Sequence, residues 1–365
     1  MRISEVEIYR ADIPFKDTFL SRMNVRAAKD VVVKVSSEDG LVGIGTTSPV
    51  PKYLGATQGI IIEGAKFLAS TISGQNPFDI EKIHSLMNDA LADNWPAKAA
   101  IDLALYDMMG KAVDKPVYQL LGGKVRDHFY TQFNFGMKQI RRPTEIAKIA
   151  KKAVKEGFRA FEVKVGIGLK ADIARIKAIR EAIGDEIILV ADANRAWTAK
   201  EAIESIRALQ GFNNIIFEEP TLGLEEMLEV REAVDAPVCA DESCHTLKDA
   251  REIVKKKAAD VLCIKIMKAG GILNCKKIAT LCDSFNVLCR IDGVPGETLV
   301  SNTAGAHIAL NAKTLIPAGS GVMQHYYTLK EDVATGGLIF NEGKVTIGEK
   351  PGLGIKLRKR MLTPA

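Results

Sequence analysis

Five charged residues stand at the ends of short apolar runs, at nearly regular intervals along the chain. The runs are FEVKVG, ILVADAN, IIFEEP, VCADES and VLCIKIMK, and their charged residues are Lys164, Asp192, Glu218, Asp241 and Lys265. Successive members lie 28, 26, 23 and 24 residues apart, about the length of one strand, one turn and one helix. Five consecutive β/α units would therefore each present a charged side chain at the C-terminal end of a strand. Three carboxylates between two lysines suit a divalent cation flanked by two bases.

The three acids predict a metal site. Carboxylates that converge in a partly dry cavity repel one another strongly, and a cation relieves that repulsion. All-oxygen ligation by Asp192, Glu218 and Asp241 suits Mg²⁺ best, and Mn²⁺ could substitute for it. The alternative is that each acid forms a salt bridge with a lysine on the same rim.

The two lysines flank the acids in strand order. A lysine that is desolvated and close to other cations has a lowered pKa and can act as a base, which is the role that we expect for Lys164 and Lys265. The alternative is that both are counter-ions of the carboxylates. Lys268 follows Lys265 by three residues, and we expect it to give electrostatic support only.

The elements that would hold these residues alternate regularly after residue 126. Apolar runs rich in Val, Ile and Leu alternate with segments of helical periodicity, as a parallel sheet covered on both sides requires. The number of such units favours a (β/α)₇₋₈ TIM-type barrel over an open doubly wound sheet. A barrel also places strand C-termini at one rim, where active sites of this architecture lie. No G-x-G-x-x-G follows the first of these strands, which argues against a dinucleotide-binding fold.

Three parts of the chain differ in pattern. Residues 1–125 begin with an antiparallel meander and continue with helical segments, which predicts an α+β capping domain. Residues 126–325 form the barrel. Residues 326–365 return to a hairpin pattern, and we expect them to pack back on the capping domain and complete it.

Composition favours an ordinary globular protein. Of the 365 residues, 47% are hydrophobic and 26% are charged, and the net charge is only +5. Because basic and acidic residues are interspersed, we expect no binding to nucleic acid or to a membrane. The N-terminus reads as a strand, not a signal peptide. The six cysteines lack paired zinc-ligand spacing, which is typical of reduced core cysteines in a cytoplasmic protein.

The motifs KVG, DAN, EEP, ADES and IKxxKxGG resemble those of the enolase superfamily, in its muconate lactonizing enzyme subgroup. The resemblance extends over essentially the whole chain and includes AAIDLALYDMMGK and PVYQLLGGK in the first domain. It implies that a small carboxylate substrate bound to Mg²⁺ loses its α-proton to a lysine, giving an enolate that the metal stabilises. Asp192, Glu218 and Asp241 would be the ligands, and Lys164 and Lys265 the acid/base pair on opposite faces of the substrate. The resemblance also implies a homo-oligomer, either a dimer or an octamer.

Further positions carry over from the resemblance. Asn194 and Glu242 follow ligands closely and could orient them. Glu297 matches a glutamate that the subgroup usually has after the seventh strand, near the substrate carboxylate. The run RIDGVPGE contains no histidine, so a mandelate-racemase-type histidine base is disfavoured.

Two departures from the family pattern stand out. The subgroup usually has Lys-x-Lys on the second barrel strand, whereas this chain has Glu162 before Lys164. We expect the carboxylate to make Lys164 more basic than in relatives. The Asp-x-Asp with which dipeptide epimerases bind the substrate ammonium on the eighth strand is also absent, since AGSGVMQHYY stands there. This absence disfavours a dipeptide substrate.

Specificity in this family is implied to come from loops of the first domain that close over the barrel. Here they would be DTFLSRMNVRAA and SPVPKYLGATQ, with Phe19, Arg22, Met23 and Tyr53 as candidates to touch the substrate. Arg22 could bind a second anionic group and Asp292 a cationic one. The alternative is that these are ordinary surface or domain-interface residues.

Two lysines on opposite faces permit 1,1-proton transfer, so we expect a racemase or epimerase that acts on an amino-acid derivative. The same residues would serve a muconate-type cycloisomerase or an acid dehydratase acting by β-elimination. A barrel that binds metal without catalysis is the non-enzymatic alternative, and the presence of both lysines argues against it.

Overall fold

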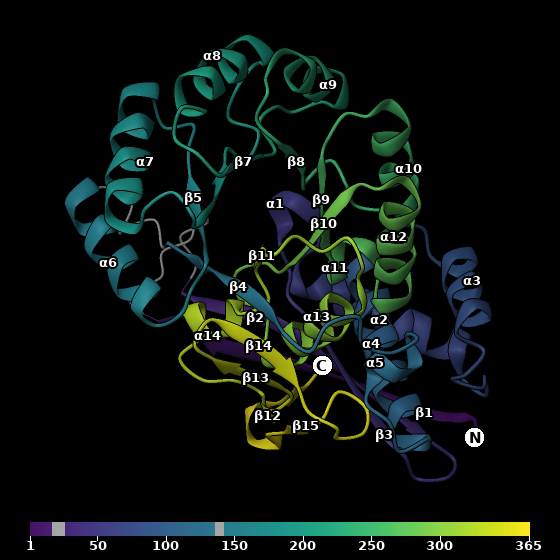
Figure 1. Ribbon diagram of the computed structural model, residues 1–365. Helices are drawn as coiled ribbons and strands as arrows, with labels where there is room; N and C mark the ends of the chain where they lie inside the picture. Colours follow the sequence, from purple (N-terminus) through teal and green to yellow (C-terminus); the bar gives the residue numbers. More distant parts are fainter. Residues whose placement is uncertain (17–25, 136–141) are drawn as a thin grey trace.

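A computed structural model describes residues 1–16, 26–135 and 142–365. It contains a barrel of parallel strands surrounded by helices, with a smaller α+β domain beside it (Figure 1). Of the residues considered above, Phe19, Arg22 and Met23 lie outside the described residues.

Eight parallel strands form the barrel within the described ranges. They are β4 (Phe129–Asn134), β5 (Ala160–Lys164), β6 (Ile188–Asp192), β7 (Ile215–Glu218), β8 (Val238–Ala240), β9 (Val261–Lys265), β10 (Leu288–Asp292) and β11 (Ala318–Ser320). Strands β4 to β10 pair in chain order, and β11 pairs with β4. The ring closes where the Ile316 and Gly321 amides donate to carbonyls of β10, each over 2.9 Å. The predicted barrel is therefore confirmed.

Helices on the outside of the barrel connect its strands (Figure 1). They are α6 (Pro143–Lys155), α7 (Leu169–Ile183), α8 (Ala199–Leu209), α9 (Leu224–Ala233), α10 (Leu247–Lys256), α12 (Ile272–Phe285) and α13 (Leu299–Asn311), with the short α11 (Ile266–Ala269) directly after β9. Capping boxes begin α8 and α10, where Thr198 pairs with Glu201 and Thr246 with Asp249. Each box satisfies backbone N–H groups that would otherwise lack partners. The strand-to-helix turns are thereby fixed near the barrel rim.

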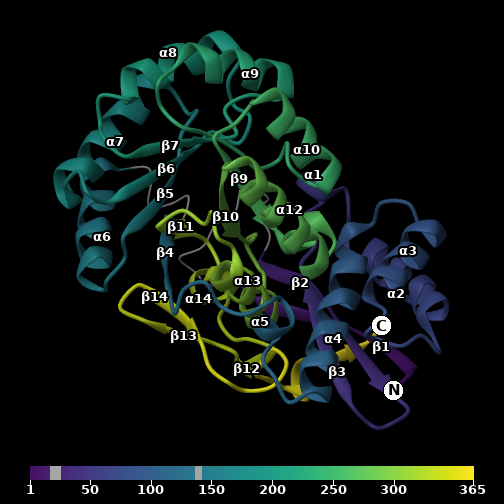
Figure 2. The ribbon, with the colours of Figure 1, turned by 45° about the vertical axis from the view of Figure 1, so that its right-hand side comes forward.

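The capping domain stands beside the barrel (Figure 2). Its antiparallel meander consists of β1 (Ile3–Pro14), β2 (Ala27–Ser37) and β3 (Val42–Thr47). Its helices are α2 (Gln58–Ile72), α3 (Ile80–Ala90) and α4 (Trp95–Ala112), followed by the short α5 (Val117–Leu120). Helix α4 packs directly on β3, where a Cβ atom on Gly43 or Gly45 would lie 1.9 Å from a carbonyl oxygen of the helix. The short α1 (Pro51–Leu54) continues from this sheet toward the barrel mouth, where Val50 packs with Met267 and Val294.

The C-terminal segment is divided between the two domains. It contains α14 (Gln324–Thr328), β12 (Ala334–Gly336), β13 (Leu338–Asn341), β14 (Lys344–Ile347), β15 (Ile355–Leu357), the 3₁₀ helix η2 (Lys359–Met361) and β16 (Thr363–Pro364). Strand β16 pairs with β1 of the antiparallel meander. The β13–β14 hairpin lies against the barrel, where β14 pairs antiparallel with β4 at Phe129 and Tyr130. These two residues precede the part of β4 that pairs with β5, so their backbone groups are available to another strand.

Buried apolar side chains fill the barrel, its helix layer and the capping sheet. All six cysteines are buried and free. In the described ranges, every helix is too short or too polar to cross a membrane.

Candidate active site

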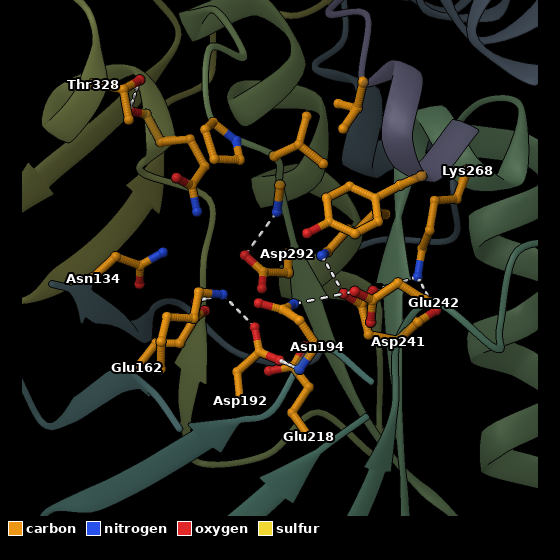
Figure 3. A pocket seen from close by; sticks show the side chains of 18 of the residues that line it. Asn134, Glu162, Asp192, Asn194, Glu218, Asp241, Glu242, Lys268, Asp292 and Thr328 are labelled. Carbon is orange, nitrogen blue, oxygen red and sulfur yellow. Dashed lines mark hydrogen bonds and ion pairs between the residues drawn. The ribbon is translucent and has the colours of Figure 1, made fainter. Parts of the chain in front are cut away.

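The five charged residues meet at one rim of the barrel. Lys164, Asp192, Glu218 and Lys265 are the last residues of β5, β6, β7 and β9, and Asp241 directly follows β8. The strand register pairs Lys164 with Asp192, and Asp192 with Glu218. All five side chains line a single pocket, and Figure 3 shows the acids among them pointing into it.

Each lysine is paired with an acid in this structure. Lys164 forms an ion pair with Asp192, and Lys265 Nζ lies 2.6 Å from Asp241 Oδ2. Lys268 Nζ lies 2.5 Å from Asp241 Oδ1. Burial opposes the charged form of Lys164 and Lys265, but the neighbouring carboxylates raise the pKa of both well above the ordinary lysine value. The counter-ion arrangement considered above is thus present, and the lysines can become bases only if another cation takes over the acids.

The acids fit such a cation. Burial raises the pKa of Glu218 well above its ordinary value, and the charges of Asp192 and Asp241 raise it further. Oxygens of Glu218 and Asp241 lie within 4.8 Å of each other and of Cys263 Sγ. Burial also raises the pKa of the Cys263 thiol, so it stays protonated and is a poor ligand. Asp192 pairs in register with Glu218 on the neighbouring strand but lies outside this group of three, and its carboxylate is the kind of oxygen donor that suits Mg²⁺.

Glu162 is a direct partner of Lys164. Its Oε1 lies 2.8 Å from Lys164 Nζ, and its Oε2 accepts a hydrogen bond of 2.6 Å from Gln132. Although burial opposes ionisation, Lys164 and Arg290 lower the pKa of Glu162 to about 2. A permanent negative charge therefore lies beside Lys164.

Arg290 is a site residue that the sequence analysis missed. It is wholly buried beneath the pocket, forms an ion pair with Glu218 and lies 2.7 Å from Asp292 Oδ2. It also donates to Gln132 Oε1 and to the Gly319 carbonyl, over 2.8 and 2.9 Å. The signal was an arginine inside the apolar run VLCRIDG, two residues before Asp292 and therefore on the same face of the strand.

Other polar groups hold the loops that carry the predicted metal ligands. The Asn194 amide donates to Asp192 Oδ1 over 2.8 Å, and Asn194 Nδ2 donates to Glu242 Oε1 over 3.1 Å. Burial, together with the charges of Asp241 and Asp192, raises the pKa of Glu242 to about 8. Glu219, which the sequence analysis also missed, accepts a hydrogen bond of 2.7 Å from the Asp241 amide. Glu219 therefore positions the loop that carries one predicted ligand.

Of the remaining predicted site residues that the structure describes, two line the pocket and one does not. Asp292 lines the pocket, and Tyr53 reaches it from α1. Glu297 is buried and is not part of the pocket lining, and its Oε2 accepts a hydrogen bond of 3.2 Å from Asn302. The loop SPVPKYLGATQ, which the sequence analysis named, also brings Val50, Lys52 and Leu54 to the pocket lining. The lining residues that the sequence analysis did not single out are Asn134, Phe135, Gly293, Val294, Pro295, Gln324, Tyr327 and Thr328.

Comparisons with known proteins agree with this architecture. Residues 3–122 match the family model "Mandelate racemase / muconate lactonizing enzyme, N-terminal domain", and residues 145–361 match "Enolase C-terminal domain-like". The chain is 39% identical to the hydrophobic dipeptide epimerase of Enterococcus faecalis, over 97% of this chain and 99% of the relative. It is 30% identical to the N-succinyl-L-Arg/Lys racemase of Bacillus cereus, over 99% of this chain and 97% of the relative.

A solved structure is similar over the same length. The crystal structure of the dipeptide epimerase from Enterococcus faecalis V583, complexed with Mg and the dipeptide L-Leu-L-Tyr, superimposes with a TM-score of 0.91 at 38% identity. The match covers 98% of this chain and 100% of that chain. Motifs, barrel, capping domain and family models agree, and the chain belongs to the enolase superfamily, in the muconate lactonizing enzyme subgroup.

Proposed function

We propose that this isomerase is a Mg²⁺-dependent racemase or epimerase that moves the α-proton of an amino-acid derivative between the two faces of its α-carbon. One observation carries the proposal: Lys164 on β5 and Lys265 on β9 approach the carboxylate cluster from different sides, and each reaches a different acid. Two candidate bases on different sides of one substrate position are what racemisation requires.

The residues divide the chemistry among them. Asp192, Glu218 and Asp241 would hold Mg²⁺, or Mn²⁺ in its place, which supplies a positive charge that acidifies the α-proton of a bound carboxylate. By turning to the cation, Asp192 and Asp241 would release the lysines, whose pKa values then fall. One lysine takes the α-proton and the other donates a proton to the opposite face. Arg290 holds Glu218 from beneath.

The wall of the pocket supports a substrate with an apolar part. Leu54, Phe135, Val294, Pro295 and Tyr327 all contribute to its lining. Relatives named for hydrophobic dipeptides and for N-succinyl amino acids both act on acylated amino acids. We therefore propose an N-acylated amino acid, including dipeptides, as the substrate class.

Exchange of the α-proton in D₂O tests the proposal. Both enantiomers of a panel of N-acyl amino acids, dipeptides and sugar acids would be incubated with enzyme and Mg²⁺, and deuterium would be followed by NMR. We expect exchange that stops when the metal is chelated. Lys164→Ala and Lys265→Ala should each abolish exchange from one enantiomer and spare the other.

The same experiment separates the rivals. Loss of water from the substrate would indicate a dehydratase, and ring formation a cycloisomerase. Lack of exchange from every carboxylate in the panel would contradict the proposal, as would exchange that neither lysine variant alters.

A homo-oligomer, either a dimer or an octamer, and a cytoplasmic location stay predictions from the family resemblance. Light scattering on the purified protein measures the first, and cell fractionation measures the second.

A further inference from the structure

We infer that Asp292 binds the free ammonium group of a dipeptide substrate, and that it does so from β10 in space that β11 leaves open. The inference rests on the proposed function and narrows its substrate class to dipeptides with an unmodified N-terminus. It reverses the expectation, drawn from the missing acids of the eighth strand, that a dipeptide is disfavoured.

The first observation is that Asp292 occupies the space that a side chain at position 321, directly after β11, would take. The residues from Ala318 to Val322 read AGSGV and contain no acid. A Cβ atom built on Gly321 would lie 1.8 Å from Asp292 Oδ1 and 2.7 Å from its Cγ. Gly321 is not among the described residues with a positive φ, so the backbone there does not itself require glycine. The glycine is needed because the Asp292 carboxylate fills that space.

The second observation is that the carboxylate is fixed and still has room for a donor. Its Oδ2 accepts from Arg290 over 2.7 Å, and its Oδ1 accepts from the Gly293 amide over 2.7 Å. A carboxylate oxygen can accept two hydrogen bonds, so Oδ1 can take a further donor from the pocket that Asp292 lines. Figure 3 shows this side chain among the labelled residues of the pocket.

The third observation is the sign of the local charge. Arg290 contacts both Glu218 and Asp292, and it lies 3.6 Å from Glu162. The single positive charge of Arg290 is therefore shared by the three carboxylates of Glu162, Glu218 and Asp292. Lys265, the register partner of Asp292, is paired with Asp241 in this structure, and it would carry no charge when it acts as the base that takes the α-proton. A cationic group of the substrate fits this position better than a neutral or anionic acyl group does.

The fourth observation is the spacing between base and acid. The reacting carbon of a dipeptide is the α-carbon beside its carboxylate, and the free nitrogen lies one residue away, about 4–5 Å from that carbon. Lys265 and Asp292 are partners on neighbouring parallel strands, which lie about 4.8 Å apart. This backbone spacing is compatible with a dipeptide whose reacting carbon faces Lys265 and whose ammonium meets Asp292.

Paired substrates test the inference. The probes are alanyl-leucine and N-acetyl-alanyl-leucine, compared by kcat/KM for deuterium exchange and by calorimetric binding to the Mg²⁺-loaded enzyme. Asp292→Asn keeps the shape and removes the charge. We expect it to weaken reaction and binding of alanyl-leucine by about 10- to 100-fold, the range for a hydrogen bond to a charged group, and to change the acetylated probe by less than about 3-fold.

Relocating the acid provides the matched control. Asp292→Gly should remove the preference for the free amino group, and adding Gly321→Asp to it should restore the preference from β11. Gly321→Asp alone should be poorly folded, because its side chain and that of Asp292 would occupy the same space. The melting temperature of this variant measures the loss of stability.

The outcomes separate the two proposals. Equal losses on both probes in Asp292→Asn would mean that Asp292 only supports Arg290, and would overturn the inference. So would a folded double variant without the preference. Selective binding of alanyl-leucine without any exchange would instead support the ammonium site and overturn the proposed racemase or epimerase.

Discussion

Glu162 places a carboxylate 2.8 Å from Lys164, where relatives are expected to carry a second lysine. A neighbouring anion stabilises the protonated form of Lys164 and raises its pKa. Glu162 therefore makes the Lys164 ammonium a weaker acid and shifts its deprotonation to higher pH. Glu162 also joins Lys164 to Gln132, so its effect on charge must be tested without removing that hydrogen bond.

Glu162→Gln makes that test. We expect the pKa of Lys164 to fall by about 1 unit or more when the charge is removed. With the enantiomer whose α-proton Lys164 takes, Lys164 must be unprotonated, so the acidic limb of the kcat/KM profile moves to lower pH. With the other enantiomer Lys164 must be protonated, so the basic limb moves to lower pH. Profiles at saturating Mg²⁺ measure both, with Glu204→Gln on the surface of α8 as control. If neither limb of the kcat/KM profile moves with either enantiomer, Glu162 does not set the pKa of Lys164.

At the residue scale, the sequence predicted which charged side chains meet at the barrel rim better than it predicted their surroundings. Asp192 and Lys265 could be found because barrel strands deliver their last residues to one rim at a regular spacing. Arg290 and the contact between Asp292 and Gly321 could not, because they depend on which side chains meet across the closed barrel. Glu297 is buried next to Gly293 of the pocket lining and accepts a hydrogen bond from Asn302, and its predicted place near the substrate stays a prediction.

At the scale of elements, the alternation of strands and helices was predictable because period and length both change at each boundary. The partner of the β13–β14 hairpin was not. A hairpin pattern shows which side chains face the core and which face solvent, but it does not show which strand has an unpaired edge with which the hairpin can pair. Here that edge is the first part of β4.

The contact between α4 and β3 gives a prediction at this scale. Gly45 lies so close to α4 that an added Cβ would meet the Ala100 carbonyl oxygen at 1.9 Å. Gly45→Ala should therefore separate helix and sheet and lower the free energy of unfolding by about 1–3 kcal/mol. Thermal melting followed by circular dichroism measures the change.

Gly59→Ala is its matched control. Gly59 is the second residue of α2, and the nearest atom to an added Cβ, Thr57 Oγ1, lies 4.0 Å away. The substitution should be neutral or stabilise by up to about 1 kcal/mol, because alanine favours helix. If both variants melt alike, the close approach does not govern the packing of α4 on β3.

At the scale of the whole molecule, the capping domain is joined to the barrel by a buried histidine. His307, in α13, accepts a hydrogen bond of 3.1 Å at Nδ1 from the backbone amide of Tyr118 in α5. The two rings stack with centroids 5.7 Å apart. Burial and the charge of Lys124 lower the pKa of His307 to about 3. Protonation at Nδ1 would remove the acceptor on which the contact depends.

The sign of the resulting pH dependence follows from linkage. The pKa of His307 in the folded state lies below its unfolded value of about 6.5, so the folded state binds fewer protons, and stability falls as pH drops from about 6.5 toward 3. Between pH 7 and pH 5 this one group should lower the free energy of unfolding by about 2 kcal/mol. His245 and His325, whose pKa values fall to about 4 on burial, add to the slope in the same direction.

His307→Gln isolates the contribution of His307, because glutamine keeps an acceptor for the Tyr118 amide but does not titrate. The variant can be less stable than the parent at pH 7, but it should lose about 2 kcal/mol less than the parent on going to pH 5, since His245 and His325 titrate in both proteins. Urea unfolding at pH 7, 6 and 5 gives the comparison. A stability difference between the two proteins that does not vary with pH would show that His307 is not the acid-sensitive contact between the domains.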